Sequence, residues 1–248
     1  TVTDTCYNCL SDIAELVIDI IGVNDAPVLS VPETLSTDED VDLIITEISI
    51  QDVDSEPTGS NNFNLEFDIA VQNGTLSLSS NTGSINYSTG DGTEDDSMIF
   101  TASVTDFNNA LSGSTFHPEN DYYGPDGQII VLVNDLGNNG IQDGGDPVEL
   151  TDSKIINIDI NNVNDPPLVT SSDNYTIEED QDNFYLTDIV LSDADVADGE
   201  MIIELTVSNG TIELSSTDDI ICLAGGNCYA AADDPGAPSN LQFRGTID

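Results

Sequence analysis

The chain has 248 residues and a formal net charge of -46, because 48 residues are Asp or Glu and only 2 are Lys or Arg. Such a chain has few side chains that could neutralise phosphate groups, so nucleic acid is not an expected partner. A folded protein of this charge repels itself unless cations screen or bind its carboxylates. The composition therefore predicts either a solvated acidic surface alone or, as we favour, acidic clusters that bind cations on such a surface.

Residues 1–21 are predicted to end a domain rather than to begin one. Glu15–Ile21 and Lys154–Ile160 are similar β-rich runs, and each leads into an Asn-Asp-x-Pro turn. Thr1–Asp4 likewise resembles Val131–Asp135, which lies late in the following repeat. We expect residues 1–21 to be the terminal strands of a preceding domain in a longer array, or of a domain in a neighbouring subunit that they complete by strand addition.

Residues 22–161 are predicted to form one complete β-rich repeat. The run Leu65–Val71 alternates apolar and polar residues, which is typical of a half-buried strand. Asn73-Gly74 follows and predicts a tight hairpin turn to a strand over Thr75–Ser79, since both residues tolerate a positive φ. Further strands are expected at Val28–Val31, Val41–Ile50, Met98–Val104, Gln128–Val133 and Ser153–Ile160, with a helical turn at Asp106–Leu111.

Residues 162–248 are predicted to begin a second copy of this repeat. Val207–Ser216 matches Val71–Ser80 almost position for position, and Leu241–Thr246 matches the strand that starts at Met98. The match ends before a counterpart of Gln128–Val133. We therefore expect this second repeat to be incomplete at its C-terminal end.

Three short motifs recur in both repeats. They are Val-Asn-Asp-x-Pro at Val23–Pro27 and Val163–Pro167, Asp-x-Asp at Asp52–Asp54 and Asp193–Asp195, and Asn-Gly-Thr after Val71 and Val207. Together they resemble the cadherin-like tandem repeats of large bacterial surface proteins and adhesins. The resemblance implies an all-β fold of tandem Greek-key β-sandwich domains placed end to end. It also implies an extracellular structural or adhesive role, calcium at the junctions, and partners that are copies of the chain placed head to tail, as in a filament or a continuing array.

The resemblance also implies which residues bind calcium. The junction before the complete repeat would use Asn24, Asp25, Asp52 and Asp54. The junction after it would use Glu39, Asn164, Asp165, Asp193 and Asp195, with Asp121 as an additional ligand, and Glu179 would serve a third junction. These side chains suit Ca²⁺, which takes six to eight oxygen ligands in adaptable geometry. The alternative is that the Asn and Asp residues only form Asx-turns, which are common before proline.

The four cysteines form two close pairs, Cys6 with Cys9 and Cys222 with Cys228. Such pairs in an acidic, strand-rich chain predict disulfides and an oxidising, extracellular compartment rather than a zinc site. Four Asn-x-Ser/Thr sequences are candidate glycosylation sites, at Asn73, Asn86, Asn174 and Asn209. The alternative for the two Asn-Gly sequences is that they serve as turns.

Catalysis is not expected. A nucleophilic triad needs a base, usually histidine, and the single histidine, His117, is predicted to lie in a surface loop before Pro118. The sequence has no run of about 18 apolar residues, so membrane insertion is not expected. The competing interpretations are a carbohydrate- or ligand-binding adhesin module, which would expose a Tyr122-Tyr123 platform, and a non-catalytic spacer of a larger secreted enzyme.

Overall fold

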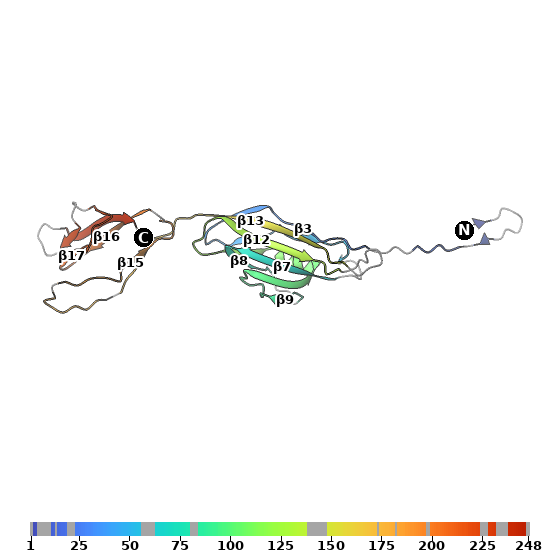
Figure 1. Ribbon diagram of the computed structural model, residues 1–248, viewed down its shortest axis with the longest axis horizontal. Coiled ribbons are helices and arrows are strands. Elements are labelled where there is room, and N and C mark those ends of the chain that lie inside the picture. Colours follow the sequence, from blue (N-terminus) through green and yellow to red (C-terminus); the bar gives the residue numbers. More distant parts are fainter. Residues whose placement is uncertain are drawn as a thin grey trace. The chain divides into compact units, whose positions relative to one another are not determined.

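The computed structural model describes residues 2–3, 11–12, 14–18, 23–55, 63–79, 84–137, 148–172, 174–181, 183–196, 199–223, 228–231 and 238–246. The chain divides into two compact units, unit 1 (Thr1–Asn161) and unit 2 (Asn162–Asp248). Both are built from strands, and the described residues contain a single helix, so the protein is all-β (Figure 1).

Unit 1 has thirteen described strands and the helix α1 (Val104–Leu111). The strands are β1 (Val2–Thr3), β2 (Ser11–Asp12), β3 (Val28–Ser30), β4 (Thr34–Asp38), β5 (Leu43–Ile45), β6 (Ser49–Gln51), β7 (Asn64–Gln72), β8 (Gly74–Ser77), β9 (Asn86–Thr89), β10 (Ser97–Ser103), β11 (Ser114–Pro118), β12 (Gly124–Asn134) and β13 (Thr151–Asn161). Six strands form one sheet in the order β4-β13-β12-β7-β10-β9, and three form another in the order β5-β11-β8. Two further pairs are β3 with β6 and β1 with β2.

One hydrophobic core joins the two larger sheets of unit 1. Alternate residues of β7, Leu65, Phe67 and Ile69, are fully buried, as the period of a half-buried strand requires. The helix contributes Phe107, whose ring stacks on Phe67 with centroids 3.8 Å apart. Phe116 of β11 is equally buried and belongs to the same cluster. The arrangement is sandwich-like, with residues of both sheets meeting in a single apolar layer.

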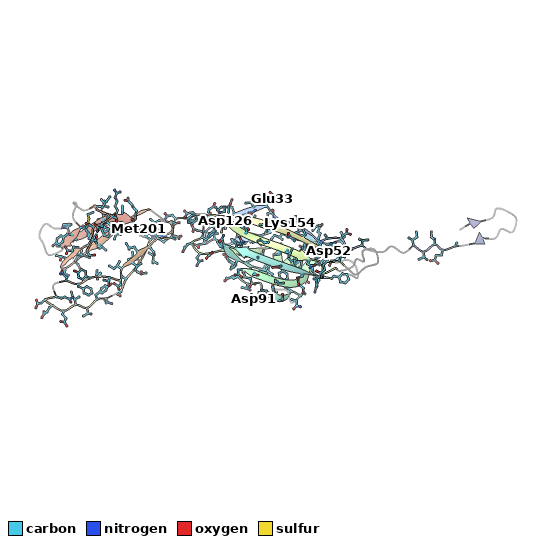
Figure 2. The ribbon with its side chains drawn as sticks, in the orientation of Figure 1. Glu33, Asp52, Asp91, Asp126, Lys154 and Met201 are labelled. Atoms are coloured by element: carbon cyan, nitrogen blue, oxygen red, sulfur yellow. A yellow bond between two sulfur atoms is a disulfide. The ribbon has the colours of Figure 1, made fainter. Side chains whose placement is uncertain are left out.

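The directions of the strands define two ends of unit 1. β12 and β13 are antiparallel, whereas β4 pairs with β13 in parallel, from Asn157 beside Thr34 to Asn161 beside Asp38. Asn24 donates a hydrogen bond to Asp135, which follows β12, so we call the end where β12 finishes and β13 starts the Asn24 end. The end where β13 finishes is the Asn161 end. Figure 2 shows Asp52 and Asp126 at these opposite ends of the unit.

The predicted hairpin at Asn73-Gly74 is wrong. Asn73 has a φ of 54°, but β7 pairs with β10 and β12 while β8 pairs with β11. The turn therefore carries the chain from the six-stranded to the three-stranded sheet. Gly74 suits this corner because a Cβ there would lie 2.4 Å from the carbonyl oxygen of His117. The dipeptide correctly predicted a positive φ at Asn73, but Gly74 does not share it, and the dipeptide could not predict which strand the next one joins.

Other elements of unit 1 also differ from expectation. The strand expected over Val41–Ile50 is two short strands, β5 and β6, separated by residues 46–48. The helical turn expected at Asp106–Leu111 is confirmed and begins slightly earlier, where the Ser103 hydroxyl accepts the backbone N–H of Asp106 as an N-cap. His117 lies in β11 rather than in a loop, so that prediction is wrong.

The pair β1–β2 has the same register as the end of β12–β13. Val2 lies opposite Asp12 and Thr3 opposite Ser11. When residues 11–21 are placed on residues 151–161, these pairs correspond to Val133 with Asp152 and Asn134 with Thr151. The similarity noticed in the sequence is thus matched by the same strand pairing.

Unit 2 repeats several of these pairings with shorter strands. They are β14 (Leu168–Thr170), β15 (Val190–Ser192), β16 (Glu200–Thr206), β17 (Thr211–Glu213), β18 (Ile220–Cys222), β19 (Tyr229–Ala231) and β20 (Asn240–Thr246). Ile203 of β16 lies opposite Phe243 of β20, as Phe67 lies opposite Phe100 in unit 1. β14 pairs with β15 as β3 pairs with β6.

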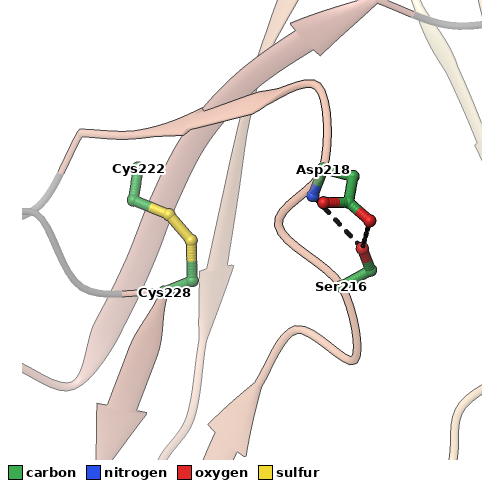
Figure 3. Close-up of a disulfide and its surroundings, with 4 residues drawn as sticks. All are labelled: Ser216, Asp218, Cys222 and Cys228. Carbon is green, nitrogen blue, oxygen red and sulfur yellow. Dashed lines mark hydrogen bonds between the residues drawn. A yellow bond between two sulfur atoms is a disulfide. The ribbon is translucent and has the colours of Figure 1, made fainter.

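The disulfide predicted between Cys222 and Cys228 is present in unit 2 (Figure 3). It links the end of β18 to the residue before β19. Beside it the Ser216 hydroxyl accepts the backbone N–H of Asp218 at 3.2 Å. Cys6 and Cys9 lie outside the described residues.

Candidate metal centre

Asn24 is the centre of a polar group at one end of unit 1. Its side chain is 3% exposed, and its Nδ2 donates to Asp135 Oδ2 at 2.6 Å and to the Val148 carbonyl oxygen at 2.9 Å. Its Oδ1 is buried and has no hydrogen-bond donor among the described residues. A buried amide oxygen without a partner is costly, so this atom requires a cation or another donor.

Asp135 completes this group and was not among the predicted ligands. It follows β12 directly and is 1% exposed. Its Oδ1 accepts the backbone N–H groups of Gly137 and Leu150, each at 2.8 Å. A sequence signal existed, because Val133-Asn134-Asp135 has the same three residue types as the Val-Asn-Asp of both linkers.

The Asp-x-Asp motif lies at the same end. Asp52 is 3% exposed and its Oδ1 accepts the N–H groups of Asp54 at 2.9 Å and Ser55 at 3.1 Å. Asp54 in turn accepts the N–H of Asp25 at 2.7 Å. Burial raises the pKa of Asp52, and the charges of Asp54 and Asp135 raise it further, against the two hydrogen bonds that lower it. Mutual repulsion of these carboxylates is the condition that a divalent cation relieves.

The donor set at the Asn24 end fits a hard cation. Two buried carboxylates, Asp52 and Asp135, belong to the same group as the orphaned amide oxygen of Asn24. Asp25 and Asp54 add two carboxylates that are less buried. The hydrogen bond from the Asp25 N–H to Asp54 also connects the linker to the Asp-x-Asp loop. All of these ligand atoms are oxygens, which suit Ca²⁺ or Mg²⁺ rather than a soft metal.

Unit 2 repeats the hydrogen bonds of the linker and loop. The N–H of Asp165 donates to the Asp195 carboxylate, and the N–H of Asp195 donates to Asp193 Oδ1 at 3.1 Å. These contacts correspond to those of Asp25, Asp54 and Asp52. Asn164 differs from Asn24, because its Nδ2 donates to the Asp165 carbonyl oxygen at 3.0 Å and its side chain is exposed.

The remaining predicted ligands belong to both units. Glu39 is 3% exposed at the Asn161 end of unit 1, where its N–H donates to the Asn161 carbonyl oxygen at 2.9 Å. Asp121 lies at the same end, exposed, and its N–H donates to Asp40 Oδ1 at 3.2 Å. Glu179 is exposed in a turn of unit 2. That Glu39 acts with Asn164, Asp165, Asp193 and Asp195 stays a prediction.

The glycosylation candidates also differ in environment. Asn86, Asn174 and Asn209 are exposed. Asn73 is half-buried, and its Nδ2, the atom that a glycan would modify, donates to the Asp126 carbonyl oxygen at 2.9 Å. Among the four, Asn73 is therefore the least suited to modification in the folded state.

His117 takes part in a row of hydrogen bonds across the three-stranded sheet. Its Nδ1 lies 2.7 Å from Asp42 Oδ1, and its Nε2 lies 3.0 Å from the Ser77 hydroxyl. His117 is thus held on a strand between two polar side chains, not in a loop. Two members of this row, Asp42 and His117, line a cavity of about 580 Å³ together with Asp40, Thr75, Glu94, Pro118, Asn120 and Asp121.

Comparison with protein-family models and with curated proteins found no match to this chain. The described part of the chain contains no helix long and apolar enough to cross a membrane.

Proposed function

We propose that the chain is an extracellular structural and adhesive repeat protein whose Val-Asn-Asp-x-Pro segments bind calcium. The observation that carries the proposal is the buried Oδ1 of Asn24, which has no donor in the part of the chain that the structure describes and whose amide bonds Asp135, a carboxylate that acts electrostatically on Asp52. Calcium satisfies that oxygen and neutralises the carboxylates together. The linker residues Asn24 and Asp25 are then tied to loops of unit 1 and lose their freedom to bend.

The same proposal assigns both units to Greek-key β-sandwiches of the cadherin-like type, arranged in tandem. It is supported by the strand registers that recur in units 1 and 2 and by the repeated contacts of the linker and Asp-x-Asp loop. The disulfide in unit 2 agrees with an oxidising, extracellular environment.

Copies of the chain, joined head to tail in a filament or continued within one array, are the proposed partners. Support comes from β1–β2, whose register is that of the strand pair that closes unit 1. A two-tyrosine carbohydrate platform is not favoured, because Tyr122 packs against the core while Tyr123 is 43% exposed.

Thermal unfolding with and without calcium tests the central claim. A ligand that binds only the folded state at about 100 times its Kd stabilises that state by about 2.7 kcal/mol. We expect the melting temperature of unit 1 to rise by several degrees in calcium, to fall back in EDTA, and to respond less to Mg²⁺, which holds its waters more tightly. Identical melting curves in calcium and in EDTA would refute the proposal.

A further inference from the structure

The row formed by Asp42, His117 and Ser77 lies on the three-stranded sheet of unit 1 and takes no part in the calcium centre. The residues come from adjacent strands, since β11 lies between β5 and β8 and Asp42 directly precedes β5. His117 lies opposite Thr75, and Thr115 lies opposite Ser77, so His117 and Ser77 are diagonal neighbours. The antiparallel register thus brings an acid, a base and a hydroxyl into one line.

The donor and acceptor roles in this row follow from the chemistry of Asp42 and Ser77. An ionised carboxylate only accepts hydrogen bonds, so Asp42 Oδ1, 2.7 Å from Nδ1, requires a proton on that nitrogen. Nε2 of a neutral His117 is then an acceptor, and the Ser77 hydroxyl, 3.0 Å away, donates to it. This is the hydrogen-bond order of an acyl-transfer triad, which is recognised by geometry and not by sequence order.

A backbone donor lies next to the hydroxyl. The N–H of Glu94 is 2.9 Å from Ser77 Oγ, and Glu94 has a φ of 50°, an unusual conformation for a residue with a side chain. Such local strain concentrates at functional sites. Because the Glu94 N–H donates to Ser77 Oγ, it orients the hydroxyl so that its proton can face His117 Nε2.

We propose that Ser77, His117 and Asp42 form an ester-hydrolysing site whose preferred substrates carry a positive charge. The cavity beside His117 has the volume of a small-ligand site and is lined by the carboxylates of Asp40, Asp42, Glu94 and Asp121. These charges attract a cationic ester and repel an anionic one. None of the three residues lies at the Asn24 end, so this activity can be tested apart from the calcium centre there, while Asp121 of the cavity is also a candidate ligand of the second linker.

The chemistry balances with water as the second reactant. Ser77 Oγ bonds to the ester carbonyl carbon while its proton passes to His117 Nε2, and Asp42 stabilises the resulting imidazolium. The carbon–oxygen bond to the alcohol then breaks, and the alcohol leaves with the proton from Nε2. Water hydrolyses the acyl-serine by the same route, which releases the acid and restores the Ser77 hydroxyl.

The test uses the full chain, a fluorophosphonate probe and three ester types: a thiocholine ester, a neutral ester and an anionic ester. Peptide mass spectrometry should find the probe on Ser77, and kcat/KM should be highest for the thiocholine ester, with an advantage that shrinks as salt is added. Ser77→Ala should lower kcat/KM by at least about tenfold. Ser88→Ala, which changes an exposed hydroxyl of the edge strand β9, should leave it unchanged.

Two results would overturn the proposal. One is hydrolysis by Ser77→Ala at the wild-type rate, which would mean that imidazole alone accounts for the reaction. The other is the absence of probe on Ser77 in the wild-type chain, a result that does not depend on whether any variant folds. A thermal melt of each variant in calcium distinguishes loss of the site from loss of the fold.

Discussion

Units 1 and 2 share strand registers but differ in how deeply the same positions are buried. Leu65, Phe67 and Ile69 of β7 are fully buried, whereas Met201, Ile203 and Leu205 of β16, which occupy the matching places, are only half-buried. β7 pairs on both edges, with β10 and β12, while β16 pairs with β20 and with no second strand among the described residues of unit 2. The register of a strand pair thus follows from the alternation of apolar and polar residues along each strand. The burial of the apolar residues depends on the further strands that flank the pair.

The linkers repeat this contrast at the level of single side chains. Asn24 and Asn164 occupy the same place in Val-Asn-Asp-x-Pro, yet Asn24 reaches a buried carboxylate and Asn164 turns to its neighbour's backbone. The difference arises from Asp135, which β12 places beside Asn24. The motif therefore supplies the ligand atoms, and the neighbouring strands and loops of the unit determine whether those atoms are buried.

The largest expected effect comes from truncating matched core positions. Phe67→Ala should destabilise unit 1 by roughly 3–5 kcal/mol, as is usual for a buried aromatic side chain. Ile203→Ala should cost unit 2 only about 1–2 kcal/mol, because that side chain is already partly exposed. Urea unfolding of each variant measures both values, and equal costs would contradict the difference in burial between the units.

The next effect concerns calcium and the two linker asparagines. Asn24→Ala removes the orphaned oxygen and two hydrogen bonds, so it should abolish most of the calcium-dependent stabilisation, about 2.7 kcal/mol at 100 times the Kd. Asn164→Ala is the matched comparison: it should weaken calcium binding only at the second linker and leave binding at the Asn24 end intact. Isothermal titration with calcium reports both. Loss of the response in Asn164→Ala alone would place the principal site elsewhere.

A smaller effect is expected at the glycines of the two Asn-Gly corners. Gly74→Ala should cost about 1–3 kcal/mol, because the new Cβ meets the His117 carbonyl oxygen at 2.4 Å and the Phe116 ring at 2.6 Å. Gly210→Ala meets no atom within 4 Å, and its φ of 90° should limit the cost to about 1 kcal/mol. Thermal melts compare the pair, and a costlier change at Gly210 would contradict the close packing of β8 on β11.

The smallest effect is the pH dependence of two acids. The pKa of Asp52 is raised above 3.8 by burial, so the folded state binds its proton more tightly than the unfolded state does. Its contribution to the unfolding free energy should therefore fall as pH rises from 3.8 through the raised pKa, and Asp52→Asn should flatten this slope in calcium-free buffer.

Asp188 of unit 2 should behave in the opposite way. Hydrogen bonds from Ser172 and Tyr175 lower its pKa below 3.8. Its contribution is present above 3.8 and is lost as pH falls through the lowered pKa, so Asp188→Asn should flatten the slope only in acid. Urea unfolding across the acid range measures both slopes. The same sign of change in both variants would show that burial does not govern Asp52.

Much of the fold could be predicted from periodicity, since apolar and polar residues alternate in β7, β12 and β13 clearly enough to identify them as strands. Which strands pair with each other could not be predicted from periodicity. The Asn73-Gly74 corner shows why, because the same dipeptide can serve a hairpin or a change of sheet. Among the candidate ligands, hydrogen bonds connect Asp25 with Asp54 and Asp54 with Asp52, while Asn24 bonds Asp135. Asp135 and the Ser77–His117–Asp42 row were missed because their partners are distant in sequence and are brought together only by strand register.

The parallel pairing of β4 with β13 has a mechanical consequence. A tensile load on unit 1 pulls β4 toward the Asn24 end, where the chain enters, and β13 toward the Asn161 end, where it leaves. The two strands are then loaded in shear along their length, so the five pairs from Thr34 with Asn157 to Asp38 with Asn161 must yield together. Shear of this kind resists force far better than peeling bonds one at a time, and it would set the unfolding rate of a stretched chain.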